Sequence, residues 1–367
     1  MSFNRLSYID LGAGVMLLYV VLSHSIATAG YFEIAYYDLW GVTDAALIPK
    51  GVHALIGNNG KIHAAGINYY MPDLFFFVMQ WFFYKSGQFF SKLTIADEWK
   101  KDWHKLMNQF ILWSAIGYVL FIGFKLWDGT LTMRNATYDV IHDLVFKGRI
   151  ELNTPLWFLF SLFVAKQVAN MILPQRDDKY FWLKSGCVLF ACFGIAFIAY
   201  YYQFSMFPVW VANSALGLAF FTLGYCLSDY ELKWWLLLPC VLLYAACCIW
   251  GFPVVSFVDN KAVNKIVYLL NLPCGFAGIV TFNVFCRIIS HYLHCISLPF
   301  EYVGKYAMII YVSHAILYKS VRGVLIIEEL TNLYPYALWI ILGSYVCFLP
   351  LFCVLYERCS KYLWRID

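Results

Sequence analysis

Ionisable side chains in the first apolar stretch are the residues best placed for chemistry. Asp10 lies near the start of this stretch, and Ser23 and His24 lie near its end. Ionisable groups inside a membrane cost several kcal/mol to insert and usually face a cavity or a bundle interior. Because imidazole has an unperturbed pKa of about 6.5, His24 is suited to proton transfer near neutral pH.

The spacing of Asp10 and His24 shows that the two side chains cannot touch each other. They are 14 positions apart. In a helix this spacing returns both to nearly the same face, but about 21 Å apart along the axis. We therefore expect them at opposite ends of one polar pathway, with Asp10 toward the cytoplasm and His24 near the outer leaflet.

The elements that position these residues are predicted to be helices in a membrane. Hydrophobic residues make up 62% of the 367 residues and charged residues 13%, whereas soluble domains are about half apolar and a quarter charged. The uncharged runs are roughly 20 residues long, the length at which a helix crosses the hydrocarbon core. Lipid offers backbone groups no partners, and the sequence lacks the alternation of barrel strands, so we predict an all-α polytopic integral membrane protein.

We predict about ten transmembrane helices in one domain that covers residues 1–367. The apolar runs lie near 8–29, 68–90, 105–126, 154–173, 183–203, 206–227, 233–251, 265–288, 300–320 and 336–356. Lys and Arg gather on the side of the amino terminus, so the positive-inside rule places both termini in the cytoplasm. The longest connections, near 30–67 and 127–153, are then extracytoplasmic.

Charge and cysteine usage argue against two other kinds of site. The net charge of +4 is mild and the basic residues fall mostly at span ends, so nucleic acid is not an expected partner. Most of the 12 cysteines lie in apolar runs, without the CxxC or Cys/His spacing of metal ligands. We expect membrane lipid around the chain and no metal.

Four segments carry a family likeness. They are RLSYID running to VVLSH at 5–24, MPDLFFF with WFFYKSG at 71–87, NTPLWFL at 153–159, and YVGKYAM through YVSH at 302–314. In order and separation they resemble the Acyl_transf_3 membrane acyltransferases, which O-acylate extracytoplasmic glycans and other acceptors. The resemblance implies a multi-pass protein of the bacterial inner membrane. It also implies transfer of an acyl group, usually acetyl, from cytoplasmic acyl-CoA to a hydroxyl of a carbohydrate or lipid-linked saccharide.

The resemblance implies His24 as the catalytic general base, with acetyl-CoA as the donor. An imidazole can take the proton of a sugar hydroxyl that attacks a thioester, a role worth about 10²–10⁴ in rate. The alternative for a membrane histidine is a structural hydrogen bond to a neighbouring helix. His314, one turn from Tyr311 in the ninth predicted span, is the second catalytic candidate, and both can face the same cavity as His24. Asp10, at the cytoplasmic end of the pathway, completes the catalytic candidates.

Basic residues on the predicted cytoplasmic side are candidates for holding the donor phosphates. They are Arg5, Lys85 with the neighbouring Ser86, and Lys100, Lys101 and Lys105. Lys85 can instead snorkel to water, and the cluster at 100–105 can instead set topology or bind anionic lipid. The family places a basic residue eleven positions before the histidine, where this chain has Ala13.

The candidates for acceptor binding are Ser23, Asn153, Trp157 and Tyr311. Asn153 and Trp157 are four residues apart, which puts them on one face of a helix, and a Trp with an amide is a common sugar-binding combination. The alternative is a helix N-cap followed by an interfacial Trp.

Two other functions remain open from the sequence. A proton-coupled transporter or exporter can use His24 and His314 as titrating groups, but proton relays generally need carboxylates, and the predicted spans hold few. The other is a catalytically inactive member of the same fold, which Ala13 favours.

Overall fold

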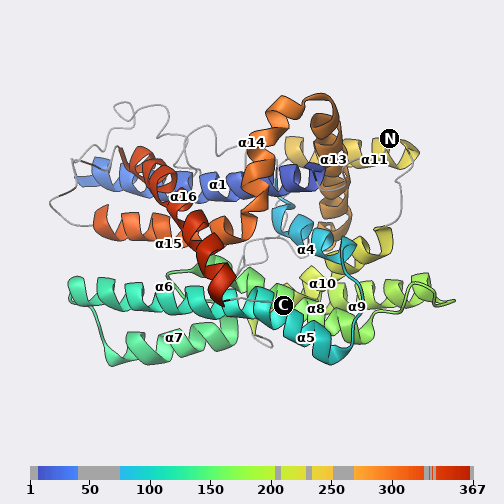
Figure 1. The fold of residues 1–367 in the computed structure, drawn as a ribbon, viewed down its shortest axis with the longest axis horizontal. Helices are drawn as coiled ribbons and strands as arrows, with labels where there is room; N and C mark the ends of the chain where they lie inside the picture. The colour runs from blue at the N-terminus through green and yellow to red at the C-terminus, as the bar shows by residue number, and fades with distance from the viewer. Residues whose placement is uncertain are drawn as a thin grey trace. The chain divides into compact units, whose positions relative to one another are not determined.

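The computed structural model describes residues 7–39, 75–202, 208–228, 234–250, 268–325, 330, 333 and 336–363 (Figure 1). Within these residues the secondary structure is helical, and the β pairing consists of one isolated bridge between Ile150 and Asn153. The predicted all-α class is therefore confirmed.

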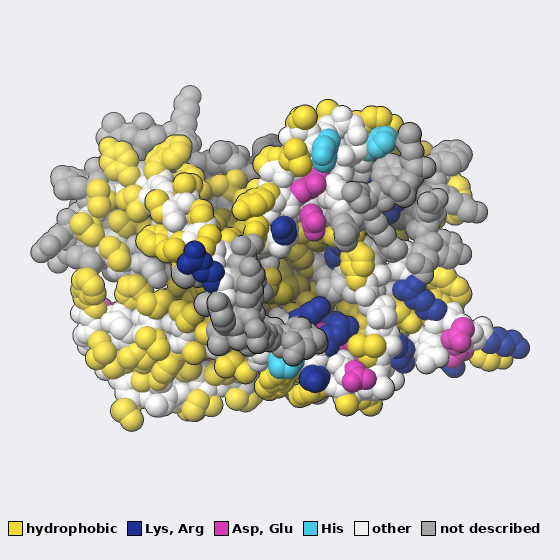
Figure 2. Space-filling model, viewed as in Figure 1, with side chains coloured by type: hydrophobic (Ala, Val, Ile, Leu, Met, Phe, Trp, Pro, Cys, Tyr) yellow, Lys and Arg dark blue, Asp and Glu magenta, His cyan; other side chains and the backbone are white. Residues whose placement is uncertain are grey.

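Seven of the described helices are long and apolar enough to cross a membrane. They are Ser7–Ile26, Ile95–Trp127, Thr154–Ile172, Phe181–Tyr201, Val209–Leu227, Asn271–Tyr292 and Ala337–Val354, and a shorter apolar helix covers Trp235–Ile249. On the face shown in Figure 2, hydrophobic side chains cover much of the described surface, as contact with lipid requires. The count of about ten spans and the cytoplasmic location of the termini stay predictions.

The described helices differ from the predicted spans at several places. α1 (Ser7–Leu39) continues past residue 29, where the first long connection was expected to begin. The run predicted as one span at 300–320 is divided at Tyr306 into α14 (His294–Lys305) and α15 (Ala307–Leu325), where Gly304 and Lys305 interrupt the apolar sequence. The connection expected at 127–153 contains helical turns, with α7 (Asp139–His142) at their centre. Residues 40–74, which include the rest of the first connection and the start of the span predicted at 68–90, lie outside the described residues.

Contacts divide the chain into two compact units, residues 1–75 with 286–367 and residues 76–285. In the first unit α1 packs against α14, α15 and α16 (Ala337–Leu363). The crossing of α1 with α14 depends on two glycines. A Cβ atom added at Gly14 would lie 1.9 Å from the main-chain oxygen of Phe300, and one added at Gly304 would lie 1.8 Å from that of Asp10. The two backbones are therefore in direct contact, as in small-residue packing of membrane helices.

The second unit is built around α10 (Val209–Leu227), which packs against α4 (Val78–Gln88), α8 (Trp157–Ile172) and α9 (Phe181–Tyr201). Thirteen of its 19 residues are buried, so it is the central helix of the unit. Glycines again permit a close crossing, because a Cβ at Gly87 would lie 2.0 Å from the main-chain oxygen of Phe221. Among the residues described between 76 and 292, the other long helices are α6 (Asn108–Trp127), α11 (Trp234–Trp250) and α13 (Asn271–Tyr292).

Two polar side chains of α4 are paired with asparagines of α13. The amide nitrogen of Gln80 donates to Oδ1 of Asn271 at 3.2 Å, and the indole nitrogen of Trp81 donates to Oδ1 of Asn283 at 2.8 Å. Such bonds join α4 to α13 where lipid offers no alternative partner.

Candidate active site

Two imidazoles meet in the first unit, one from α1 and one from α15. The ring centroids of His24 and His314 lie 5.6 Å apart, with their planes inclined at 31°. His314 has no exposed surface, and His24 is half-buried. The fold thus brings together the two histidines that the sequence proposed for catalysis, although they lie far apart in the chain.

The hydrogen bonding of His314 indicates which of its ring nitrogens carries the proton. Nδ1 lies 2.7 Å from the main-chain oxygen of Tyr311, one turn earlier in α15. A carbonyl oxygen only accepts, so Nδ1 donates, and the neutral ring then keeps its lone pair on Nε2. Nε2 is buried and has no hydrogen-bond partner among the described residues. Because buried polar atoms are rarely left without a partner, this acceptor marks a position where a proton donor or a polar ligand is expected.

Two tyrosines of α15 pack around the imidazole pair. The ring of Tyr318 stacks on His24, with centroids 5.5 Å apart and planes within 11°, and it lies 6.2 Å from the ring of His314. The ring of Tyr311 lies 5.8 Å from that of His314 on the same helix. Spacings of three and four residues place these side chains of α15 on one face. The packing limits the rotation of both imidazoles.

α16 completes the cluster through Tyr345. Its hydroxyl lies 3.4 Å from Oγ of Ser25 and donates, also over 3.4 Å, to the main-chain oxygen of His314. Ser25 in turn donates to the main-chain oxygen of Val21 at 2.7 Å. The structure therefore places Ser25 in this network, whereas the sequence proposed its neighbour Ser23, which is half-buried.

Asp10 lies away from the imidazole pair, on the part of α1 that crosses α14, where its main-chain oxygen faces Gly304. This position agrees with the separation of Asp10 and His24 that helical geometry predicts. Lys319, next to Tyr318 in sequence, is half-buried. Arg5 lies outside the described residues.

Lys85 and Ser86, proposed for the donor phosphates, lie in the last turn of α4 in the second unit. The side chain of Lys85 is buried, and its ammonium lies over the rings of Trp81 and Phe89, 5.6 and 4.9 Å from the two centroids. It therefore packs on aromatic rings and does not extend to water. The hydroxyl of Ser86 donates to the main-chain oxygen of Phe82 at 2.9 Å.

The basic residues at 100–105 differ in their surroundings. Lys100 and Lys105 are exposed. Lys101 is bound by an acid of its own helix, because its Nζ lies 3.0 Å from Oε2 of Glu98. The three lysines of this cluster are thus not equivalent, and Lys101 is already paired.

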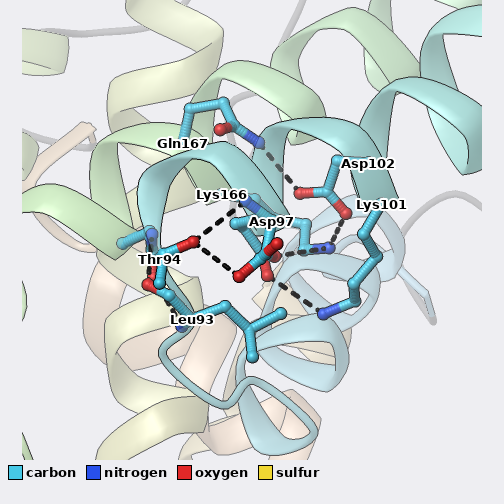
Figure 3. A network of polar contacts seen from close by, with 9 residues as sticks. Leu93, Thr94, Asp97, Lys101, Asp102, Lys166 and Gln167 are labelled. Carbon is cyan, nitrogen blue, oxygen red and sulfur yellow. Dashed lines mark hydrogen bonds and ion pairs between the residues drawn. The ribbon is translucent and has the colours of Figure 1, made fainter.

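Two of the three acids of α5 (Ile95–Asp102) are buried against α8, and sequence reasoning missed the network that they form (Figure 3). Glu98 and Asp102 have no exposed surface. Lys166 of α8 donates to Oδ1 of Asp102 and lies 3.2 Å from Oε1 of Glu98, while Gln167 donates to Oδ2 of Asp102 at 3.1 Å. Two carboxylates therefore face the two ammonium groups of Lys101 and Lys166. A lysine within the apolar run at 154–173 was the sequence signal that could have revealed the network.

The arrangement expected for Asn153 and Trp157 is wrong in one respect. Asn153 precedes a 3₁₀ turn (Thr154–Leu156), and α8 begins only at Trp157, so the two do not lie on one α-helical face. The Asn153 side chain makes no capping hydrogen bond, and both residues are buried. The alternative of an N-cap with an interfacial Trp is therefore not supported either.

Among the residues that the structure describes, no three His, Cys, Asp or Glu side chains lie close enough together to hold a metal ion.

The described residues define a multi-pass helical membrane protein with a pair of imidazoles, one of them fully buried, where α1 meets α15. The Acyl_transf_3 family, whose description is acyltransferase domain, matches residues 6–357, and the chain belongs to this family. No curated protein and no solved structure matches the chain.

Proposed function

We propose that this membrane acyltransferase moves an acetyl group from acetyl-CoA at the cytoplasmic face to a hydroxyl of an extracytoplasmic carbohydrate or lipid-linked saccharide, in a bacterial inner membrane. Membership of the acyltransferase family supports the class of reaction. The observation that carries the site is the buried Nε2 of His314, which lacks a hydrogen-bond partner in the described part of the chain and lies beside the ring of His24.

In the proposed reaction His24 acts as general base. The hydroxyl oxygen of the acceptor attacks the thioester carbon while a ring nitrogen of His24 takes the hydroxyl proton. The carbon–sulfur bond then breaks, and the CoA thiolate leaves and takes up that proton. The products are the acetyl ester and CoA, and base catalysis of this kind is worth about 10²–10⁴ in rate.

His314 acts through His24 as a positioning residue. Its Nδ1–H donates to the main-chain oxygen of Tyr311, so its Nε2 can only accept a hydrogen bond while the ring is neutral. If the facing nitrogen of His24 donates to this Nε2, the other nitrogen of His24 keeps the lone pair that the acceptor hydroxyl needs. A fixed partner of this type sets both the tautomer and the orientation of a catalytic histidine.

For the donor phosphates we retain Lys85, because its ammonium is buried and held in place by the rings of Trp81 and Phe89. A cation removed from bulk water interacts more strongly with a phosphate than an exposed one does.

Binding of the donor tests the proposal first. We expect millimolar acetyl-CoA to raise the melting temperature of the purified full chain, because a ligand of the native state stabilises it. Desulfo-CoA, which keeps the phosphates but carries no thioester, is a control for recognition of the nucleotide part. Transfer is then measured as acetyl label from acetyl-CoA moved to a cell-envelope saccharide extract by proteoliposomes. A transporter or an inactive member of the family would give no transferred label, and that result would contradict the proposal.

A further inference from the structure

The helix that leads into α6 is too long to lie wholly inside a bilayer. The apolar helical segment runs from Ile95 to Trp127 and has 33 residues, which corresponds to about 50 Å at 1.5 Å per residue, whereas the hydrocarbon core is about 30 Å thick. α6 alone, with 20 residues, fills that core. The preceding turns, α5 and the π-helical turn η1 (Trp103–Met107), therefore lie at one membrane surface.

The charges of this surface segment are divided between an inward and an outward side. Asp102 is buried against Lys166 of α8 (Figure 3). Glu98 is also buried and lies 3.2 Å from the same ammonium, so both negative charges are neutralised inside the protein. Lys100 and Lys105 are exposed. The remaining acid, Asp97, is exposed and accepts a hydrogen bond from Thr94 at 2.6 Å at the start of the helix. The outward side therefore carries a net positive charge, although α5 itself contains three acids and two lysines.

Two tryptophans lie within two positions of these lysines in the sequence. The rings of Trp99 and Trp103 stack with centroids 5.8 Å apart, and both pack against Phe163 of α8. They nevertheless remain 47% and 36% exposed. Indole side chains are enriched at the headgroup level of membranes, where one edge is in contact with lipid and the other with water.

The segment is also held rigidly. The side-chain amide of Asn170 accepts from the backbone nitrogen of Leu93 at 3.1 Å and donates to its backbone oxygen at 3.0 Å, and Lys92 donates to the main-chain oxygen of Leu173. Together with the Glu98–Asp102–Lys166 contacts, these bonds fix α5 on α8. A rigid surface loses little entropy when it binds a ligand.

We propose that Trp99, Lys100, Trp103 and Lys105 form a binding site for the phosphate headgroup of an anionic phospholipid. The lysines attract the phosphate, and the indoles pack on the glycerol and upper acyl region. A lipid fits these residues better than a soluble nucleotide does. The two lysines are interspersed in the sequence with the exposed indoles of Trp99 and Trp103, which a lipid would cover and a soluble nucleotide would leave in water. The inference is independent of the proposed acyl transfer.

Native mass spectrometry of the full chain in mild detergent tests the site, with phosphatidylglycerol and phosphatidylcholine titrated separately. We expect the K100Q/K105Q double variant to bind phosphatidylglycerol about 25-fold more weakly than the wild type, from about fivefold per lysine. The binding of phosphatidylcholine should be the same in both proteins. Lys179→Gln is the matched control, since Lys179 is also exposed and lies beside an aromatic ring, that of Tyr180 at 5.5 Å, but in a different connection.

Three outcomes would overturn the proposal. The first is equal phosphatidylglycerol binding by the wild type and K100Q/K105Q. The second is an equal loss in Lys179→Gln, which would indicate a general charge effect. The third is displacement of the lipid by adenosine 3′,5′-bisphosphate, which would assign the lysines to a soluble nucleotide. The melting temperature of each variant shows whether its fold is intact.

Discussion

The ring of His24 lies parallel to the ring of Tyr318, with the planes 11° apart and the centroids separated by 5.5 Å. This stacking connects α1 to α15. The ring of His24 has a second ring contact, which is with His314. The orientation of the proposed base therefore depends on an aromatic surface that carries no charge.

Replacement of Tyr318 tests this dependence. In Tyr318→Ala the His24 ring loses its stacking partner, and we expect the turnover number for acetyl transfer to fall roughly tenfold, about 1.4 kcal/mol of transition-state stabilisation. Tyr318→Phe keeps the ring and should retain most of the activity. If the Phe variant were as impaired as the Ala variant, the hydroxyl and not the stack would be the important group.

Replacement of His314 separates the role of its Nε2 as a hydrogen-bond acceptor from the role of its ring in packing. His314→Phe fills the same space but removes the Nε2 lone pair, so we expect a loss of about 10²-fold in turnover with a small change in melting temperature. His314→Gln supplies an amide oxygen that can accept a hydrogen bond from His24, and it should recover part of the rate. Equal activity in the wild type and His314→Phe would remove His314 from the proposed mechanism.

The α1–α14 crossing predicts a sharp stability effect at Gly14. A methyl group there would meet the main-chain oxygen of Phe300 at 1.9 Å, a contact that requires the helices to move apart. We expect Gly14→Ala to lower the free energy of unfolding by about 1–3 kcal/mol or more. Gly123→Ala is the control, because nothing lies within 4 Å of a Cβ at that position of α6 and alanine favours a helix. Denaturation in detergent measures both, and a stable Gly14→Ala protein would contradict this helix packing.

The network of Glu98, Asp102 and Lys166 predicts a rescue. Lys166→Met alone leaves two buried carboxylates with one ammonium partner, and it should cost about 3–5 kcal/mol of stability. The triple variant E98Q/D102N/K166M removes the charges together and should be more stable than the single variant. The measurement is the unfolding free energy of each protein in the same detergent. A triple variant less stable than Lys166→Met would argue against mutual neutralisation of these groups.

The sequence could predict the parts of this molecule that depend on local pattern. Apolar runs indicate helices in a membrane, and polar residues such as His24 and His314 within those runs indicate functional positions. Which helices are neighbours is not a local property. The contact of Tyr318 with His24, the bonds of Tyr345, and the pairing of α5 acids with Lys166 all join residues distant in the chain, so only the fold reveals them. Spacing also misled at Asn153, because a 3₁₀ turn separates it from α8.

The central claim is tested most directly by acetyl transfer in proteoliposomes that contain His24→Ala. We predict that this variant folds, shows the same rise in melting temperature with acetyl-CoA as the wild type, and transfers no measurable label. The control is His142, a partly exposed histidine of the second unit. The variant His142→Ala should transfer label at the wild-type rate. Wild-type turnover by His24→Ala would contradict the account, because the base would then have to be another group.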